Sequence, residues 1–292
     1  MYDGTNINIS ADNSKSSSDQ LNYINATLNS NNININTKED TNIKGANLNA
    51  EDTLAINTNN LNIASVQNTT KTKSNSKGSS VGFGADGLSS VGVNSSNSRS
   101  NSKEILLTTL IAKEVNINAE QETKLKGATV AAVDSDGKDN GNLNLKTDTL
   151  TVSSLNNTYN SNSKSLEVNL GGSVKDNNAD NISLDYSNDK TNSKIKTLAT
   201  LGSGNIQVSN AEKSDTKMLN RDIENSTVDI YNINSHKGLK GELDTRLVTS
   251  DGRKEIAKDA KEFGKNIQTV AQGLPEANND NVVISSIGKG LD

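Results

Sequence analysis

The sequence predicts a mainly β protein: a parallel β-helix with projecting hairpins, followed by a small helical C-terminal region. Short runs such as NININ, LAIN and LTVSS alternate apolar and polar residues, which is the period of a strand. These runs recur inside a repeated unit, as they must in a solenoid. Aromatic residues make up only 2% of the chain, and Trp is absent. An antiparallel sandwich or barrel also fits the strand spacing, but its core normally needs large aromatic side chains.

The repeated unit sets the expected domain boundaries. Residues 27–46 and 109–128 are alike at an offset of 82, and residues 54–69 and 143–158 are alike at an offset of 89. Seven residues are therefore inserted, in the polar stretch 134–141. We expect one repeat over 27–108, a second over 109–199 and a third that stops at 200–210. With about 20 residues per coil, residues 1–210 would form a β-helix roughly 50 Å long.

The chain contains 47 Asn residues, about one residue in six. Asn tolerates the left-handed backbone of tight corners, and stacked Asn side chains can form amide ladders. Both properties favour the β-helix over the sandwich.

One glycine-rich segment, 78–102, is unlike the rest of the repeat. It predicts a hairpin that pairs Val81–Phe83 with Val91–Val93. We expect this hairpin to project from the rod, with Val81, Phe83, Val91 and Val93 as a possible contact surface. A purely structural hairpin is the plainer alternative. Residues 166–174 stand at the equivalent place in the next repeat.

From residue 211 the alternation ends, and we expect a helical C-terminal extension over 211–292. Ser250 or Asp251 can cap a helix, and Gly273–Pro275 can end it. The apolar residues between them recur at helical spacing: Ile256, Ala260, Phe263, Ile267 and Val270.

The chain offers little for catalysis or cofactors. It has no Cys, and its one histidine, His236, lies in a polar stretch that suggests a surface loop. Residues 82–87 match G-x-G-x-x-G without the βαβ context that dinucleotide binding requires. Three carboxylates, Asp134, Asp136 and Asp139, form a weak calcium candidate, although a solvated turn is the plainer interpretation. We therefore expect no enzyme, no catalytic residue, no cofactor and no other metal site.

Charge gives no sign of a nucleic-acid partner. The net charge is −5, the pI is about 5.1 and the two signs are mixed along the chain. Residues 1–4 do not resemble a signal peptide. We expect the export signal to lie on sequence outside this chain, and the chain to be a fragment of a longer reading frame.

Three segments resemble the haemagglutinin-repeat region of filamentous-haemagglutinin-like exoproteins, the passengers of two-partner secretion, which include contact-dependent growth inhibition effectors. They are VNINAEQETKLKGATVAA at 115–132, LNLKTDTLTVSSLNNTYNSNSKS at 143–165 and KGSSVGFGADGLSSVGVNSSNSRSNS at 77–102. The resemblance covers about residues 1–270. It implies secretion through an outer-membrane transporter, a cell-surface location and a target-cell outer membrane or receptor as partner.

Two functions follow from that resemblance. The first is a structural delivery stalk within an adhesin or a contact-dependent toxin carrier, without catalysis in this segment. The alternative is a receptor- or glycan-binding adhesin module for host or bacterial attachment. A β-helical polysaccharide lyase is a distant third, because no cluster of Asp, Lys and Arg suggests its cleft.

Overall fold

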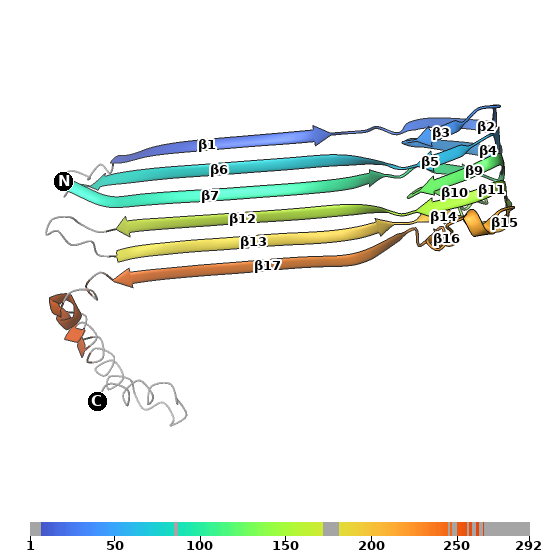
Figure 1. Ribbon diagram of the computed structural model, residues 1–292. Helices are drawn as coiled ribbons and strands as arrows, with labels where there is room; N and C mark the ends of the chain where they lie inside the picture. The colour runs from blue at the N-terminus through green and yellow to red at the C-terminus, as the bar shows by residue number, and fades with distance from the viewer. Residues whose placement is uncertain are drawn as a thin grey trace, which may run out of the picture.

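The computed structural model describes residues 7–84, 87–171, 181–244, 246, 250–255, 257–258, 261–262 and 265. Its strands form two sheets of different kinds (Figure 1). Short strands form a block in which every pairing is parallel, which we call the parallel stack. Six long antiparallel strands extend from one side of that block, and we call them the arm sheet. The protein is therefore mainly β, as the sequence predicts.

The parallel stack grows by one coil about every 20 residues. Ala26 lies opposite Ala46, Thr41 opposite Leu61 and Thr109 opposite Thr129. The register thus confirms the coil length expected from the sequence. The strands are β2 (Ala26–Asn36), β3 (Thr41–Lys44), β4 (Ala46–Thr58), β5 (Leu61–Ala64), β8 (Thr109–Ala112), β9 (Glu114–Lys126), β10 (Thr129–Ala132), β11 (Leu143–Ser153), β14 (Ala199–Leu201), β15 (Gly204–Val208) and β16 (Leu219–Asn220).

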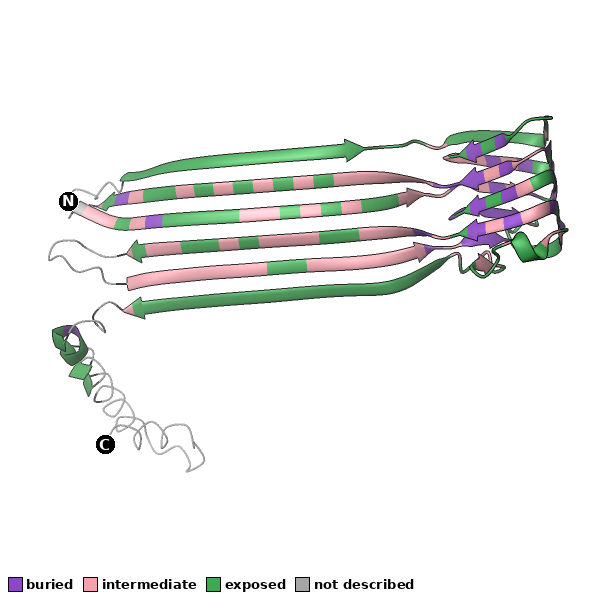
Figure 2. Ribbon diagram, viewed as in Figure 1, coloured by how far each residue is buried: buried purple, intermediate pink, exposed green. Residues whose placement is uncertain are grey.

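The hydrophobic core consists of aliphatic columns, each of which takes one residue from each coil it crosses. Figure 2 shows that buried residues concentrate in the parallel stack. Because each coil repeats the same apolar positions, small aliphatic side chains fill the interior without aromatic residues. One column contains Leu28, Leu48, Leu110, Val130 and Leu201, and another contains Ile35, Ile56, Ile117, Leu145 and Ile206.

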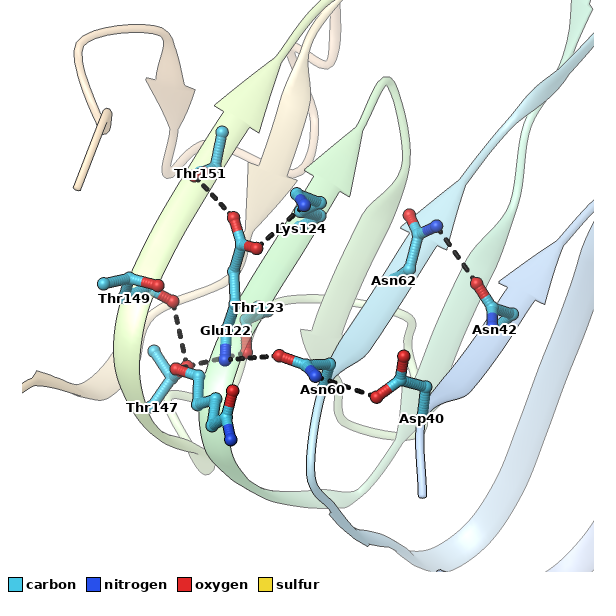
Figure 3. A network of polar contacts seen from close by, with 11 residues as sticks. Asp40, Asn42, Asn60, Asn62, Glu122, Thr123, Lys124, Thr147, Thr149 and Thr151 are labelled. Carbon is cyan, nitrogen blue, oxygen red and sulfur yellow. Dashed lines mark hydrogen bonds and ion pairs between the residues drawn. The ribbon is translucent and has the colours of Figure 1, made fainter. Parts of the chain in front are cut away.

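Polar side chains also stack from coil to coil (Figure 3). Inside the stack, the Thr41 hydroxyl donates to Thr58 Oγ1 at 2.9 Å, and the Thr123 hydroxyl donates to Thr147 Oγ1 at 3.1 Å. These two pairs stand at the offsets of 82 and 89 found in the sequence. Outside, amides form the expected ladders: Asn49 to Asn29, Asn62 to Asn42 and Asn144 to Asn116.

The arm sheet follows chain order, and each strand pairs antiparallel with its neighbours. A single continuous β-helix over residues 1–210 is therefore wrong, because a large share of those residues lies in the arms. For the same reason the expected rod of about 50 Å is too long. The six strands are β1 (Ile7–Leu21), β6 (Val66–Gly84), β7 (Gly87–Leu106), β12 (Leu155–Gly171), β13 (Asn181–Thr197) and β17 (Thr227–Asp244).

The expected helical extension over 211–292 is also wrong across β17, which pairs with β13 along its whole length. Residues 227–244 are therefore part of the arm sheet. A single 3-10 turn, η2 (Ala211–Lys213), lies before β17 in the chain. Residues 250–255, 257–258, 261–262 and 265 are helical, within the expected helix. All five apolar residues that predicted this helix lie outside the described residues: Ile256, Ala260, Phe263, Ile267 and Val270. Within the described part of the chain, no helix has the length and apolarity needed to cross a membrane.

Candidate functional surface: the arm sheet

We call β6 with β7, and β12 with β13, the two arms of the arm sheet. The hydrogen-bonded point at which the β6–β7 arm leaves and rejoins the stack is called the neck. The β6–β7 arm leaves after Ala64 and returns at Thr108. The Thr108 backbone N–H donates to Ser65 Oγ at 2.8 Å, and the Thr108 hydroxyl donates to the Ala64 carbonyl at 2.9 Å. The Ser65 hydroxyl donates in turn to the Gly127 carbonyl of the next coil. Exit, return and the next coil are therefore tied at one point.

Where a coil carries no arm, a glycine closes it instead. Gly45 and Gly127 stand at equivalent repeat positions and have φ of 60° and 51°, a left-handed backbone that suits glycine. A Cβ on Gly127 would lie 2.9 Å from Leu155 Cβ, at the start of β12. At this one position of each coil, the chain therefore either makes a tight glycine turn or begins an arm.

Strand alternation divides the arm-sheet side chains between two faces. One face, the aliphatic–basic face, carries all the Lys and Arg residues of the six strands except Lys240. Among the described residues of this face, Asp19, opposite Lys71, is the only acidic one. The basic residues are Lys15, Lys71, Lys73, Lys77, Arg99, Lys103, Lys164, Lys190, Lys194, Lys196 and Lys237.

The other face, the hydroxyl–acidic face, is built of small polar residues. Ser14, Ser76, Ser96, Ser165 and Ser187 form one row across five strands. Within that row the Ser76 and Ser96 hydroxyls lie 2.8 Å apart, as do those of Ser165 and Ser187. The acidic residues on this face are Asp12, Glu104, Glu167, Asp185, Asp189, Asp229, Glu242 and Asp244.

Charge is therefore segregated across a single layer of sheet. The glycines on the hydroxyl–acidic face add to the difference, because neighbouring polar side chains lie over them. Gly92, for example, is covered by the side chains of Asn169 and Ser80. The long cationic side chains, Lys240 excepted, stand on the opposite face.

The predicted contact hairpin is present and forms part of a wider surface. Its register is shifted from the predicted pairing of Val81–Phe83 with Val91–Val93, because Val81 lies opposite Val91 and Ser79 lies opposite Val93. Phe83 and Val93 are exposed on the same side. The neighbours that β12, β13 and β17 bring to this hairpin could not be predicted from its own residues. One row crosses all six strands and is entirely aliphatic: Ile9, Val81, Val91, Leu170, Ile182 and Leu243.

His236 lies in strand β17 rather than in a loop. It is directly opposite Asp189 on β13, and its Nδ1 is hydrogen-bonded to Asp189 Oδ1. Both side chains are exposed on the hydroxyl–acidic face. The pair links two neighbouring strands, in agreement with the other polar pairs across this sheet.

The aspartates of the weak calcium candidate hold backbone groups. Asp134 Oδ1 accepts the N–H groups of Asp136 and Lys138, each at 2.9 Å. Asp139 Oδ2 accepts the Ser203 N–H of the next coil at 2.6 Å. Among the described residues, no three acidic or histidine side chains are grouped to hold a metal ion. The seven-residue insert is thus a turn that fastens one coil to the next.

The glycines of residues 82–87 lie at the far end of the β6–β7 arm. Gly82 and Gly84 belong to strand β6, and Gly87 begins β7. A strand follows Gly87, whereas a dinucleotide fingerprint requires a helix there.

Comparison with known proteins gives one family. No curated protein and no solved structure matches the chain. The family model described as hemagglutinin repeat matches twice, over residues 2–79 and 68–149, which together cover half of the chain. Each match contains coils of the parallel stack and arm strands. On these two matches, the chain belongs to the hemagglutinin-repeat family.

Proposed function

We propose that this chain is a structural stalk segment of a filamentous-haemagglutinin-like exoprotein, and that its parallel stack is a stretch of β-helix. The supporting observation is the aliphatic column Leu28, Leu48, Leu110, Val130 and Leu201, in register through five strands. Such columns bury their side chains only by stacking, so further coils can extend the rod at either end. The segment has no catalytic role in this proposal.

The family context supplies the rest of the proposal. The exoprotein passes an outer-membrane transporter of two-partner secretion and acts at the cell surface, as an adhesin or a contact-dependent toxin carrier. The stalk holds the arm sheet away from the rod, where it meets a target-cell outer membrane or receptor. The exposed residues Phe83 and Val93, with the half-buried Val81 and Val91 beside them, would make that contact.

One replacement separates the stalk from its arm. Lys44–Gly45–Ala46 is the armless form of the turn, so replacing residues 65–107 with one glycine imitates it between Ala64 and Thr108. We expect the stack to fold and binding to bacterial cells to fall. The full chain should bind bacterial cells more than epithelial cells. A folded variant that lacks β6 and β7 but binds undiminished would contradict the role of the β6–β7 arm.

A second candidate, a glycan-binding adhesin module, rests on a groove outside the stack. Amide side chains of neighbouring coils line it, and amides recognise sugar hydroxyls well. The groove residues are Ala55, Asn57, Asn116, Ile117, Asn118, Asn144, Leu145, Lys146, Asn205 and Gln207.

A glycan array with the purified chain tests this candidate. Asn118→Ala with Asn205→Ala should abolish any signal, whereas Asn62→Ala, an amide outside the groove, should leave it unchanged. Binding that resists the groove substitutions would exclude the groove as the site.

A further inference from the structure

The far end of the aliphatic–basic face is an exposed apolar surface, which we call the tip patch. Its first row is the six-strand aliphatic row that contains Ile9 and Leu243. The next row towards the stack places Val93, Val168 and Leu184 side by side. Ile9 is 60% exposed and Val93 51% exposed. The remaining apolar members of the patch are Ile7, Ala11, Phe83, Leu166, Tyr186 and Leu239.

The tip patch is large for a surface that faces solvent. Six strands about 4.8 Å apart and three rows about 6.8 Å apart along each strand give an area of about 600 Å². The area is mainly apolar, and the other residues in these rows are Asn13, Lys77, Ser79, Ser95 and Gly241. Apolar patches of about that size on monomers usually mark an interaction site. Two such patches in contact would bury about 1,200 Å², the lower limit for a stable dimer.

We propose that a second copy of this chain covers the tip patch, face to face, in a two-fold symmetric dimer, which must separate before the hairpin residues of the proposed function contact a target. An isologous contact needs a surface that is complementary to itself, and a flat aliphatic patch satisfies that condition. The hydroxyl–acidic face offers no comparable surface, because its tip row contains Ser10, Ser80 and Glu242.

The basic residues decide the orientation of the dimer. One basic residue, Lys77, lies within the patch, in the row of Leu166 and Tyr186. Directly behind the patch lie Lys15, Lys164 and Lys237, followed by Lys73, Arg99 and Lys190. If the two sheets overlapped with their strands in the same direction, each basic row would face its own copy. Repulsion therefore favours the antiparallel overlap, in which only the tips face each other. The basic rows of each copy then lie beyond the tip of the other.

In this antiparallel overlap, Val93 of one copy faces Val91 of the second copy. Adjacent residues of β7 point to opposite faces, so Val93→Lys and Asn94→Lys form a matched pair. We expect the full chain to sediment as a dimer of twice 30.9 kDa, with a dissociation constant on the order of micromolar. Val93→Lys should weaken the dimer at least about 100-fold, and Asn94→Lys less than about 3-fold. Circular dichroism checks that both variants are folded.

A mixing experiment tests the orientation independently. Val91→Glu and Val93→Lys should each be monomeric, and an equimolar mixture should form a heterodimer through a Lys–Glu contact. A wild-type chain that stays monomeric at about 100 µM would overturn the proposal. Equal weakening by both lysine variants would overturn the choice of face. A ladder of masses above the dimer would assign association to the open edges of β1 and β17 instead. A monomer that floats with phosphatidylcholine vesicles would make lipid the occupant.

Discussion

The backbone N–H of Thr108 donates to Ser65 Oγ at 2.8 Å, although the two residues are 43 positions apart in sequence. Thr108 is fully buried and Ser65 is buried beside it. The contact closes the coil across the excursion, so the parallel stack continues as if the arm were absent. A long insertion is tolerated here because its ends are held together by the stack.

Removal of the Thr108 hydroxyl should therefore weaken the neck. In Thr108→Val, the Ala64 carbonyl loses a donor, and the Gly45 N–H loses an acceptor at 3.0 Å. We expect a loss of about 1–3 kcal/mol in the free energy of unfolding, because buried polar groups lose partners. Urea unfolding followed by circular dichroism measures it. Thr109→Val is the control, because Thr109 is only half-buried; an equal loss there would show that the neck has no special role.

The strands of the parallel stack could be predicted from the sequence because apolar and polar residues alternate along them. Apolar residues such as Ile33, Ile35 and Leu54 alternate with polar ones because one side of each strand is buried and the other faces water. The repeat offsets of 82 and 89 also relate the Thr41–Thr58 pair to the Thr123–Thr147 pair, although the hydrogen bonds themselves were found only in the structure.

The middle of each arm could not be predicted in the same way, because neither face of the sheet is buried. The segment TKTKSNSK at 70–77 alternates strictly, but between hydroxyl and long polar side chains. Analysis of apolar periodicity does not detect that pattern. A search for Ser or Thr alternating with Lys, Arg or Asn would have found β6 and β7.

The separation of basic and acidic residues between the two faces of the arm sheet could not be predicted for a related reason. Lys73 and Arg99 lie opposite each other only because of the pairing register, and that register is not readable from either strand alone. Positive and negative residues are mixed along the sequence, whereas in the arm sheet they lie on opposite faces.

Stability should reside in the stack and not in the arms. Leu125 is buried among other aliphatic residues, whereas Leu166 is 44% exposed on the arm sheet. We expect Leu125→Ala to cost about 2–5 kcal/mol, because it leaves a cavity in a close-packed column. Leu166→Ala should cost less than about 1 kcal/mol. Guanidinium unfolding of both variants, below the concentration at which the chain associates, provides the comparison. Similar losses would mean that the arm sheet shares the core.

The turn that leads into β17 should respond to acid. Hydrogen bonds from the Asn225 amide and from two backbone N–H groups hold the pKa of Asp222 below its ordinary value of 3.8. A lowered carboxyl pKa stabilises the fold above the ordinary value, and this contribution is lost as the pH falls through the folded-state pKa. Asn225→Ala should move the pKa of Asp222 upward, and carbon-detected NMR titration measures it. An unchanged pKa would show that the Asn225 amide is not its cause.

The substitution Gly127→Ala should lower the free energy of unfolding more than Gly137→Ala, at a glycine that also has positive φ but has open space around it. Gly127 and Gly137 both have positive φ, at 51° and 77°. A Cβ on Gly137 would meet nothing within 4 Å, whereas a Cβ on Gly127 would press on Leu155 at 2.9 Å. Gly137→Ala thus measures backbone strain alone, about 1 kcal/mol, and Gly127→Ala adds a steric term at the start of β12. We expect Gly127→Ala to lose at least about 2 kcal/mol more than Gly137→Ala in urea unfolding. Because Leu155 begins the second arm, the same variant should also speed hydrogen exchange at the β12–β13 end nearest the stack. Equal losses for the two variants would show that β12 can shift without cost, and that the glycine is needed only for its φ.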